Sequence, residues 1–176
     1  MKIAVIGYSG AGKSTTAKLL ANYYNCPLLY LDKVQFLPNW VERDRDEARV
    51  MVKNFLDEND CWIIDGNYPK FCQAERLEQA DKILFFSFNR FTCFFRALRR
   101  FRQFAGKTRE SVAEGCIEKV DFEFACWILY KGRTAEKRRY YKSIERKFPQ
   151  KFIRFKNQKQ VDTYLRKIGI EPISAG

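Results

Sequence analysis

The sequence predicts an α/β fold in which a parallel β-sheet lies between two layers of helices. Short apolar runs rich in β-branched residues alternate along the chain with longer segments of helical periodicity. Glycine or aspartate follows the first three of these runs, where a parallel sheet places its ligand-binding edge. The 176 residues contain no repeats or linker-like stretches. We therefore expect one domain over residues 1–176.

The first half of the chain begins with an apolar run at residues 2–6, a glycine-rich turn and a helix. The helix shows one apolar face: Ala17, Leu20, Ala21 and Tyr24. A second strand over residues 27–31 ends at Asp32, and residues 34–41 are aromatic and irregular. Asp44 and Glu47 resemble a capping box before a helix whose apolar face is Ala48, Met51, Val52, Phe55 and Leu56. A third strand over residues 61–64 leads to Asp65.

The second half starts with a fourth strand over residues 82–88. A basic helix follows over residues 90–104, and we expect its aromatic stripe to face the core: Phe91, Phe94, Phe95, Leu98 and Phe101. Residues 116–130 are apolar and predict a largely buried helix, and residues 134–146 predict a basic one. A fifth strand over residues 152–155 precedes a closing helix between Asn157 and Gly169.

The composition restricts the class of protein. No apolar run approaches the roughly 20 residues that span a bilayer, and the chain shows no leader-like segment. We therefore expect a cytoplasmic protein that does not enter membranes. Its six cysteines are scattered and its histidine count is zero, which argues against zinc. Any general base must come from Asp, Glu, Lys, Tyr or Cys. The net charge of +12 favours anionic partners.

The most specific motif is G-x-x-x-x-G-K-[ST], the phosphate-binding loop or Walker A pattern, at residues 7–14. Its glycines let backbone N–H groups surround an anion, and the following helix N-terminus adds positive potential. We expect the phosphates of a nucleoside triphosphate to bind here, with Lys13 on the outer phosphates and the Ser14 hydroxyl on Mg²⁺. The residues assigned to nucleotide binding are Gly7, Ser9, Gly10, Ala11, Gly12, Lys13, Ser14 and Thr15.

Two aspartates follow the neighbouring strands. Asp32 and Asp65 would lie beside the phosphate-binding loop at the same edge of the sheet. Such acids can hold Mg²⁺, directly or through water, or orient an acceptor hydroxyl. We assign Asp65 to the metal and the substrate, and Asp32 to acceptor binding and catalysis. The alternative is that either aspartate only caps the next turn.

Arginines supply candidate groups for the transferred phosphate. Arg96 and Arg100 lie one turn apart, and planar guanidinium groups stabilise the charge of phosphoryl transfer. The loop around Gly106 resembles part of a lid, roughly residues 102–132, that brings Arg109 to the site on closure. The alternative for each arginine is a solvated surface.

Other candidates belong to the acceptor pocket. Phe36 and Trp40 either line that pocket or pack as ordinary loop residues. Arg138, in a basic cluster before two tyrosines, is assigned to substrate binding, whereas most of that cluster fits a surface role. Basic residues beside aromatic ones also suit single-stranded nucleic acid, so nucleic acid is a second possible partner. The sequence gives no oligomeric state.

These residues together resemble a known family. Residues 7–14, residues 63–70 and the arginine-rich helix resemble nucleoside monophosphate kinase-like proteins, with Lys70 where arginine is usual. Residues 31–33 are similar to small-acceptor members such as shikimate kinase. Three segments resemble, more closely, adenylate kinase-related proteins named DNA topology modulation proteins: residues 31–33 with 38–40, residues 62–68, and residues 106–109 with 114–116.

The resemblance implies a three-layer α/β/α P-loop NTPase with a five-stranded parallel sheet in the order 2-3-1-4-5 and a small helical lid. It implies an ATP- and Mg²⁺-dependent kinase that phosphorylates a small molecule, whereas the family's name implies an alternative effect on DNA topology. The segment after Asp32 is aromatic and lacks the Ser-Thr-Gly pattern of nucleotide acceptor sites. The acceptor therefore stays open.

Overall fold

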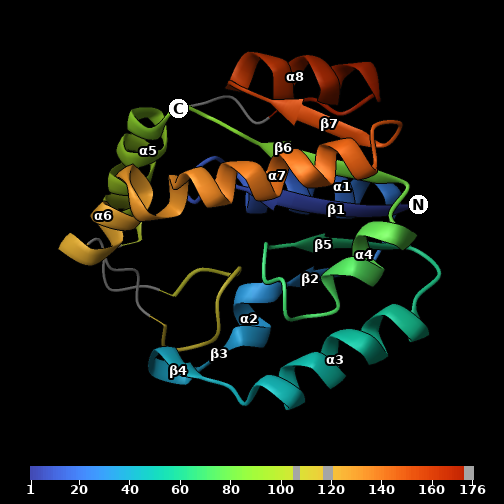
Figure 1. Cartoon of the computed structure of the whole chain (residues 1–176), viewed down its shortest axis with the longest axis horizontal. Coiled ribbons are helices and arrows are strands. Elements are labelled where there is room, and N and C mark those ends of the chain that lie inside the picture. The colour runs from blue at the N-terminus through green and yellow to red at the C-terminus, as the bar shows by residue number, and fades with distance from the viewer. Residues whose placement is uncertain (105–107, 117–120, 173–176) are drawn as a thin grey trace.

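The computed structural model describes residues 1–104, 108–116 and 121–172. Its central sheet consists of five parallel strands: β1 (Lys2–Gly7), β2 (Leu28–Tyr30), β5 (Trp62–Asp65), β6 (Lys82–Phe86) and β7 (Phe152–Phe155). The spatial order is β2-β5-β1-β6-β7, which is 2-3-1-4-5 when the strands of this sheet are counted (Figure 1). The predicted α/β fold is confirmed.

Helices cover both faces of the sheet, because successive side chains of a strand point to opposite sides. On one face Ile3 and Val5 pack with α1 (Lys13–Tyr24), α5 (Arg90–Gln103), α6 (Phe122–Leu129) and α8 (Gln158–Lys167). On the other, Ala4 and Ile6 pack with α2 (Leu31–Gln35), α3 (Arg45–Glu58), α4 (Gln73–Gln79) and α7 (Ala135–Lys147). These two apolar cores make the three layers.

Several short elements were not predicted. The aromatic segment after Asp32 contains α2 and a two-stranded antiparallel ribbon of β3 (Phe36–Leu37) and β4 (Val41–Glu42), joined by the 3₁₀ turn η1 (Pro38–Trp40). Helix α4 lies between β5 and β6, and the 3₁₀ turn η2 (Lys131–Arg133) precedes α7. The ribbon extends the molecule beyond the carboxyl end of β2 (Figure 1). The caps at Asp44 and Asn157 are confirmed, since both side chains accept backbone N–H groups.

The predicted aromatic core stripe of α5 is wrong for most of its phenylalanines, although Phe94 packs against the core. Phe91 and Phe95 are 59% and 64% exposed, whereas Cys93 and Ala97 are fully buried. A Cβ added to Gly10 would lie 2.4 Å from the Cys93 carbonyl oxygen, so α5 packs directly on the phosphate-binding loop. Small side chains are needed at such a close approach. The helix expected over residues 116–130 is also shorter: α6 begins at Phe122, which is 85% exposed, and residues 117–120 lie outside the described part.

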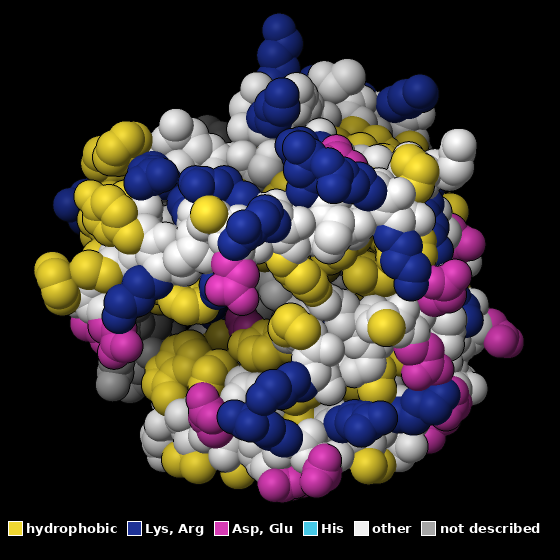
Figure 2. All heavy atoms as spheres, viewed as in Figure 1, with side chains coloured by type: hydrophobic (Ala, Val, Ile, Leu, Met, Phe, Trp, Pro, Cys, Tyr) yellow, Lys and Arg dark blue, Asp and Glu magenta, His cyan; other side chains and the backbone are white. Residues whose placement is uncertain are grey.

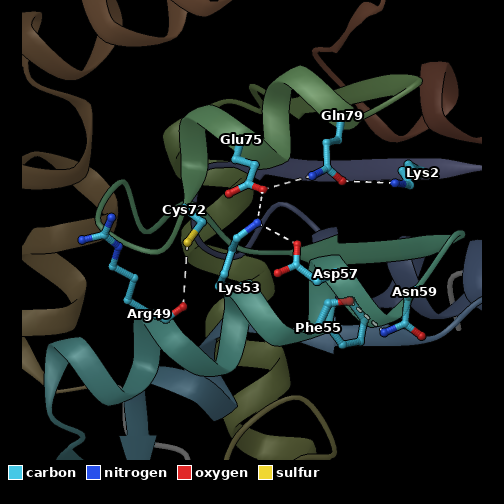
Figure 3. A network of polar contacts seen from close by, with 9 residues as sticks. All are labelled: Lys2, Arg49, Lys53, Phe55, Asp57, Asn59, Cys72, Glu75 and Gln79. Carbon is cyan, nitrogen blue, oxygen red and sulfur yellow. Dashed lines mark hydrogen bonds and ion pairs between the residues drawn. The ribbon is translucent and has the colours of Figure 1, made fainter.

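A polar network joins α3, α4 and β1 on the surface (Figure 3). The Lys53 ammonium donates to Asp57 Oδ1 and to Glu75 Oε1, both at 2.7 Å. The Gln79 amide donates to the same Glu75 oxygen at 3.2 Å and accepts from Lys2 Nζ at 3.1 Å. Both acids raise the pKa of Lys53. The network is exposed, so it orients these elements more than it stabilises them.

Candidate nucleotide and acceptor site

The phosphate-binding loop joins β1 to α1 at the carboxyl edge of the sheet. Gly10 and Gly12 have φ angles of +77° and +91°, in the left-handed region that favours glycine. Gly12 occupies the N-cap of α1, and no side chain in the described ranges caps that helix. The first N–H groups of α1 can therefore bind an anion. Lys13 Nζ donates to the Tyr8 carbonyl oxygen at 3.1 Å, which folds the lysine over the loop.

Ser14 and Asp65 meet at the base of the loop. The Ser14 hydroxyl donates to Asp65 Oδ2 at 2.6 Å, joining the first turn of α1 to the end of β5. Asp65 is buried, and burial raises the pKa of its carboxyl to about 6, while Lys13 and the Ser14 hydrogen bond oppose that rise. The second oxygen, Oδ1, is buried without a hydrogen-bond partner in the described structure.

This pair fits a magnesium ion. A buried carboxylate oxygen without a partner, beside a serine hydroxyl and a phosphate-binding loop, is the oxygen donor set that Mg²⁺ uses together with substrate phosphates. The described residues contain no group of three or more His, Cys, Asp or Glu side chains able to hold a metal by themselves. Phosphate and water would therefore have to supply the remaining ligands.

Asp32 lies in the first turn of α2, directly after β2, and not in a loop. The Tyr68 hydroxyl donates to Asp32 Oδ1 at 2.8 Å. Burial raises the pKa of Tyr68, and the neighbouring Asp32 carboxylate raises it further, so the phenol stays a donor. The negative charge of Asp32 also raises the pKa of Asp65. The two carboxylates thus lie at the carboxyl ends of neighbouring strands, as expected, since Asp65 ends β5 and Asp32 follows β2.

Residues 66–71 carry contacts that the sequence did not reveal. Asn67 Oδ1 accepts the Gly7 N–H at 2.9 Å, and its Nδ2 donates to the Gly7 carbonyl at 3.0 Å. Arg76 is fully buried in α4 and donates to carbonyl oxygens of this segment. Burial lowers the pKa of Arg76 to about 10, so it stays charged at neutral pH. Arg76 lies on the buried face of α4 together with Gln73 and Leu77.

The arginines of α5 take different positions. Arg96 is half-buried; its guanidinium donates to the Ala11 carbonyl at 3.2 Å and to Gln158 Oε1 at 2.6 Å. Burial lowers the pKa of Arg96. It therefore braces the phosphate-binding loop from outside. Arg100 lies one turn further along α5. Arg133, which belongs to the same basic cluster as Arg138, places its guanidinium carbon 3.9 Å from the Tyr8 ring centroid and donates to the Phe88 carbonyl at 2.9 Å.

Part of the expected lid lies against the β3–β4 ribbon. The Trp40 N–H donates to Cys116 Sγ at 3.3 Å, and Cys116 donates to the Leu37 carbonyl at 3.4 Å. Glu110 pairs with Lys18 of α1. Residues 108–116 therefore contact both the β3–β4 ribbon and α1 in this structure. Residues 105–107 and 117–120 of the same segment lie outside the described ranges.

Two cavities flank Phe36 in this region. One, of about 390 Å³, lies between α2, β3 and residues 108–114, and its cationic lining residues are Lys33, Arg43 and Arg109. The other, of about 330 Å³, is lined by Tyr68, Phe71 and Lys70 among others. Figure 2 shows the surface hollowed between α7 and the β3–β4 ribbon, with hydrophobic side chains gathered below the hollow.

The remaining predicted acceptor residues differ in their placement. Phe36 lines both cavities and packs edge-on against Trp40, with ring centroids 5.2 Å apart. Trp40 has a φ of +63°, and its N–H is used by Cys116. Arg109 donates to the Ser111 hydroxyl at 2.9 Å and lowers the pKa of Asp65. Arg138 is exposed on α7, and the described contacts do not bring it to Asp32 or Asp65.

Comparisons with known proteins agree with this geometry. No family model matches the chain. The adenylate kinase of Clostridium botulinum (strain Alaska E43 / Type E3) is 31% identical over a match covering 45% of this chain and 46% of that protein. The adenylate kinase of Clostridium kluyveri (strain ATCC 8527 / DSM 555 / NBRC 12016 / NCIMB 10680 / K1) is 32% identical, over 44% and 45%. The match thus spans about half the length of these curated relatives.

A solved structure extends the similarity in fold to nearly the whole chain. This structure is of an uncharacterized protein from Eubacterium ventriosum ATCC 27560. The match covers 96% of this chain and 98% of that chain, with a TM-score of 0.52 and 20% sequence identity. The fold and the loop define a P-loop protein of the α/β/α class. The matches relate it, more particularly, to the adenylate kinases. Nothing in these comparisons shows the name that refers to DNA topology.

Proposed function

We propose that this protein is a phosphotransferase that moves the γ-phosphate of ATP to a hydroxyl or phosphate group of a small acceptor. One observation carries the proposal: a second carboxylate, Asp32, is held by Tyr68 beside the buried Ser14–Asp65 pair. Enzymes of phosphoryl transfer use an oriented acid beside the phosphate site to position the attacking nucleophile, and Asp32 has the position for that role. The relation to adenylate kinases supports the same reaction class.

The donor half of the site follows from the loop. The N–H groups of residues 9–15 would bind the phosphates, and Lys13 would leave the Tyr8 carbonyl to neutralise the outer ones. Ser14 and Asp65 would hold Mg²⁺. When bound, the ion neutralises phosphate charge and helps align the transferred group. Arg96 fixes the loop through Ala11, and we assign charge stabilisation during transfer to Arg100 and Arg109.

The acceptor half centres on Asp32. Tyr68 occupies Oδ1, and we assign Oδ2 to the acceptor hydroxyl, which it would orient and whose proton it would accept during transfer. We assign Phe36 and Trp40 to the wall of the pocket and residues 102–132 to its cover. Arg138 is exposed, and the described contacts do not bring it to Asp32, so it is the weakest member of this set.

The proposal includes a location for the protein in the cell. Among the described residues, no helix is both long and apolar enough to cross a membrane. All six cysteines are free thiols, which suits the reducing cytoplasm that we propose as the protein's location.

The test is an ADP-release screen over nucleoside monophosphates, nucleosides and small hydroxylated metabolites, with Mg²⁺ present. Lys13→Ala is the control for donor binding. Asp32→Asn is the matched variant for the acceptor half, and it should retain ATP binding but lose acceptor-dependent turnover by on the order of 10²-fold or more. Acceptor-dependent turnover that is unchanged in Asp32→Asn would contradict the role of that acid. ATP hydrolysis that no acceptor stimulates would contradict the kinase assignment.

A further inference from the structure

Residues 66–71 touch both halves of the proposed site. Asn67 forms two hydrogen bonds with the backbone of Gly7, at the start of the phosphate-binding loop. The next residue, Tyr68, donates to Asp32 in the acceptor half. A shift of this short segment therefore moves a donor-side and an acceptor-side contact together.

The buried guanidinium of Arg76 holds residues 66–71 in place. Arg76 is 0% exposed, and its Nε donates to the Phe71 carbonyl at 2.8 Å. Its Nη2 donates to the carbonyls of Asn67 and Tyr68, at 3.2 and 3.0 Å. Gln73 adds a bond from Nε2 to the Asn67 carbonyl at 2.6 Å. The Arg76 Nη1 adds a longer bond to the Gly66 carbonyl at 3.5 Å, so one guanidinium binds four carbonyls at both ends of the segment.

The chemistry of that contact is unusual for a core arginine. A buried charge is normally paired with an opposite charge, because desolvation is costly. The hydrogen bonds found for Arg76 in the described structure all go to backbone carbonyls. A planar guanidinium can address several diverging carbonyls at once, whereas an ammonium is a single point charge. The contact therefore defines the shape of residues 66–71.

We propose that Arg76 is a positioning residue that couples the phosphate-binding loop to the acceptor half through Asn67 and Tyr68. Arg76 contacts neither proposed substrate and acts only through the segment that it holds. The inference rests on the proposed function for its kinetic consequences, and on the hydrogen bonds alone for its structural ones.

Single variants separate the contact with the phosphate-binding loop from the contact with the acceptor half. Asn67→Ala should weaken ATP binding about 5-fold, the equivalent of one net hydrogen bond, and leave the acceptor KM unchanged. Tyr68→Phe should leave ATP affinity unchanged and alter acceptor-dependent turnover. Arg76→Lys should do both. Leu165→Ala, a buried residue of α8, is the control for lost stability without lost positioning.

Double variants test whether Arg76 affects ATP binding through Asn67. Adding Asn67→Ala to Arg76→Lys should weaken ATP binding little beyond either single change, because Arg76 acts on the loop through Asn67. Multiplicative effects on the ATP Kd would overturn the coupling. The coupling would also be overturned if Arg76→Lys and Leu165→Ala lose the same stability and bind ATP with the same affinity. If Arg76→Lys does not fold, Gln73→Met removes the neighbouring bond to Asn67 and takes its place in the same cycle.

Hydrogen exchange keeps this inference separate from the proposed function. In the absence of any ligand, Arg76→Lys should speed amide exchange in residues 66–71 and also at Gly7 and Tyr8. Faster exchange confined to residues 66–71 would overturn the coupling even if the protein proves to be a kinase. A parent chain that binds no ATP would sink the proposed function, and the exchange result would still decide the role of Arg76.

Discussion

Replacing Asp65 by asparagine should stabilise the protein at pH 7.5 while damaging its site. Burial raises the pKa of the Asp65 carboxyl to about 6 from an ordinary 3.8. The difference of about 2 pH units corresponds to roughly 3 kcal/mol at 1.36 kcal/mol per unit. Since the folded chain binds this proton more tightly than the unfolded chain, stability falls as pH rises from about 4 to about 6. The full cost is present at pH 7.5.

Urea unfolding of the parent and the Asp65→Asn variant between pH 4 and 8 measures this cost. Asparagine keeps an oxygen that can accept the Ser14 hydroxyl, so the hydrogen bond can survive the change. We expect the variant to be about 1–3 kcal/mol more stable at pH 7.5, with the difference shrinking below pH 5. Its Mg²⁺-dependent gain in ATP affinity should be lost. A variant less stable than the parent at pH 7.5, or a difference independent of pH, would refute the reasoning.

Three further predictions concern the fold and its supports. Ile63→Ala empties a fully buried position of β5 and should lower the free energy of unfolding by about 2–5 kcal/mol in urea titrations, whereas Val50→Ala on the exposed side of α3 should change it little. Cys116→Ala removes the sulfur that contacts both Leu37 and Trp40, and it should speed tryptic cleavage at Arg109. Cys126→Ala is the control, and equal cleavage rates would count against the packing of residues 108–116 on the β3–β4 ribbon. Arg133→Lys should cost about 1–2 kcal/mol through the lost contact with Tyr8, read as a lower Tm that Arg139→Lys does not show.

The sequence predicted the elements whose signals are local. The strand at residues 2–6, the glycine spacing after it and the cap at Asp44 each depend on neighbours a few residues apart. The positions of Asp32 and Asp65 at adjacent strand ends also followed, because parallel strands bring their carboxyl ends to one edge.

The features that could not be predicted from the sequence depend on contacts between distant segments. The two-residue strands β3 and β4 are too short for a hydrophobic period, and Cys116 meets them from about 75 residues away. Hydrophobicity favoured the phenylalanines of α5 for the core, but close backbone approach selected Cys93 and Ala97. Asn67 acts through the backbone of Gly7, 60 residues distant, and no periodic pattern marks such a bond.

The central position of β1 has a consequence for how the chain folds. Lys2 is in register with Trp62 of β5, and Ile3 with Lys82 of β6, so neither partner of β1 is near it in sequence. During synthesis at about 5–20 residues per second, some seconds pass before β6 emerges. Until β5 and then β6 have emerged, the strand that leads into the phosphate-binding loop lacks its native strand neighbours. Parallel pairing over such separations is slow, so the nascent N-terminal segment is where we expect chaperones to bind and early aggregation to begin.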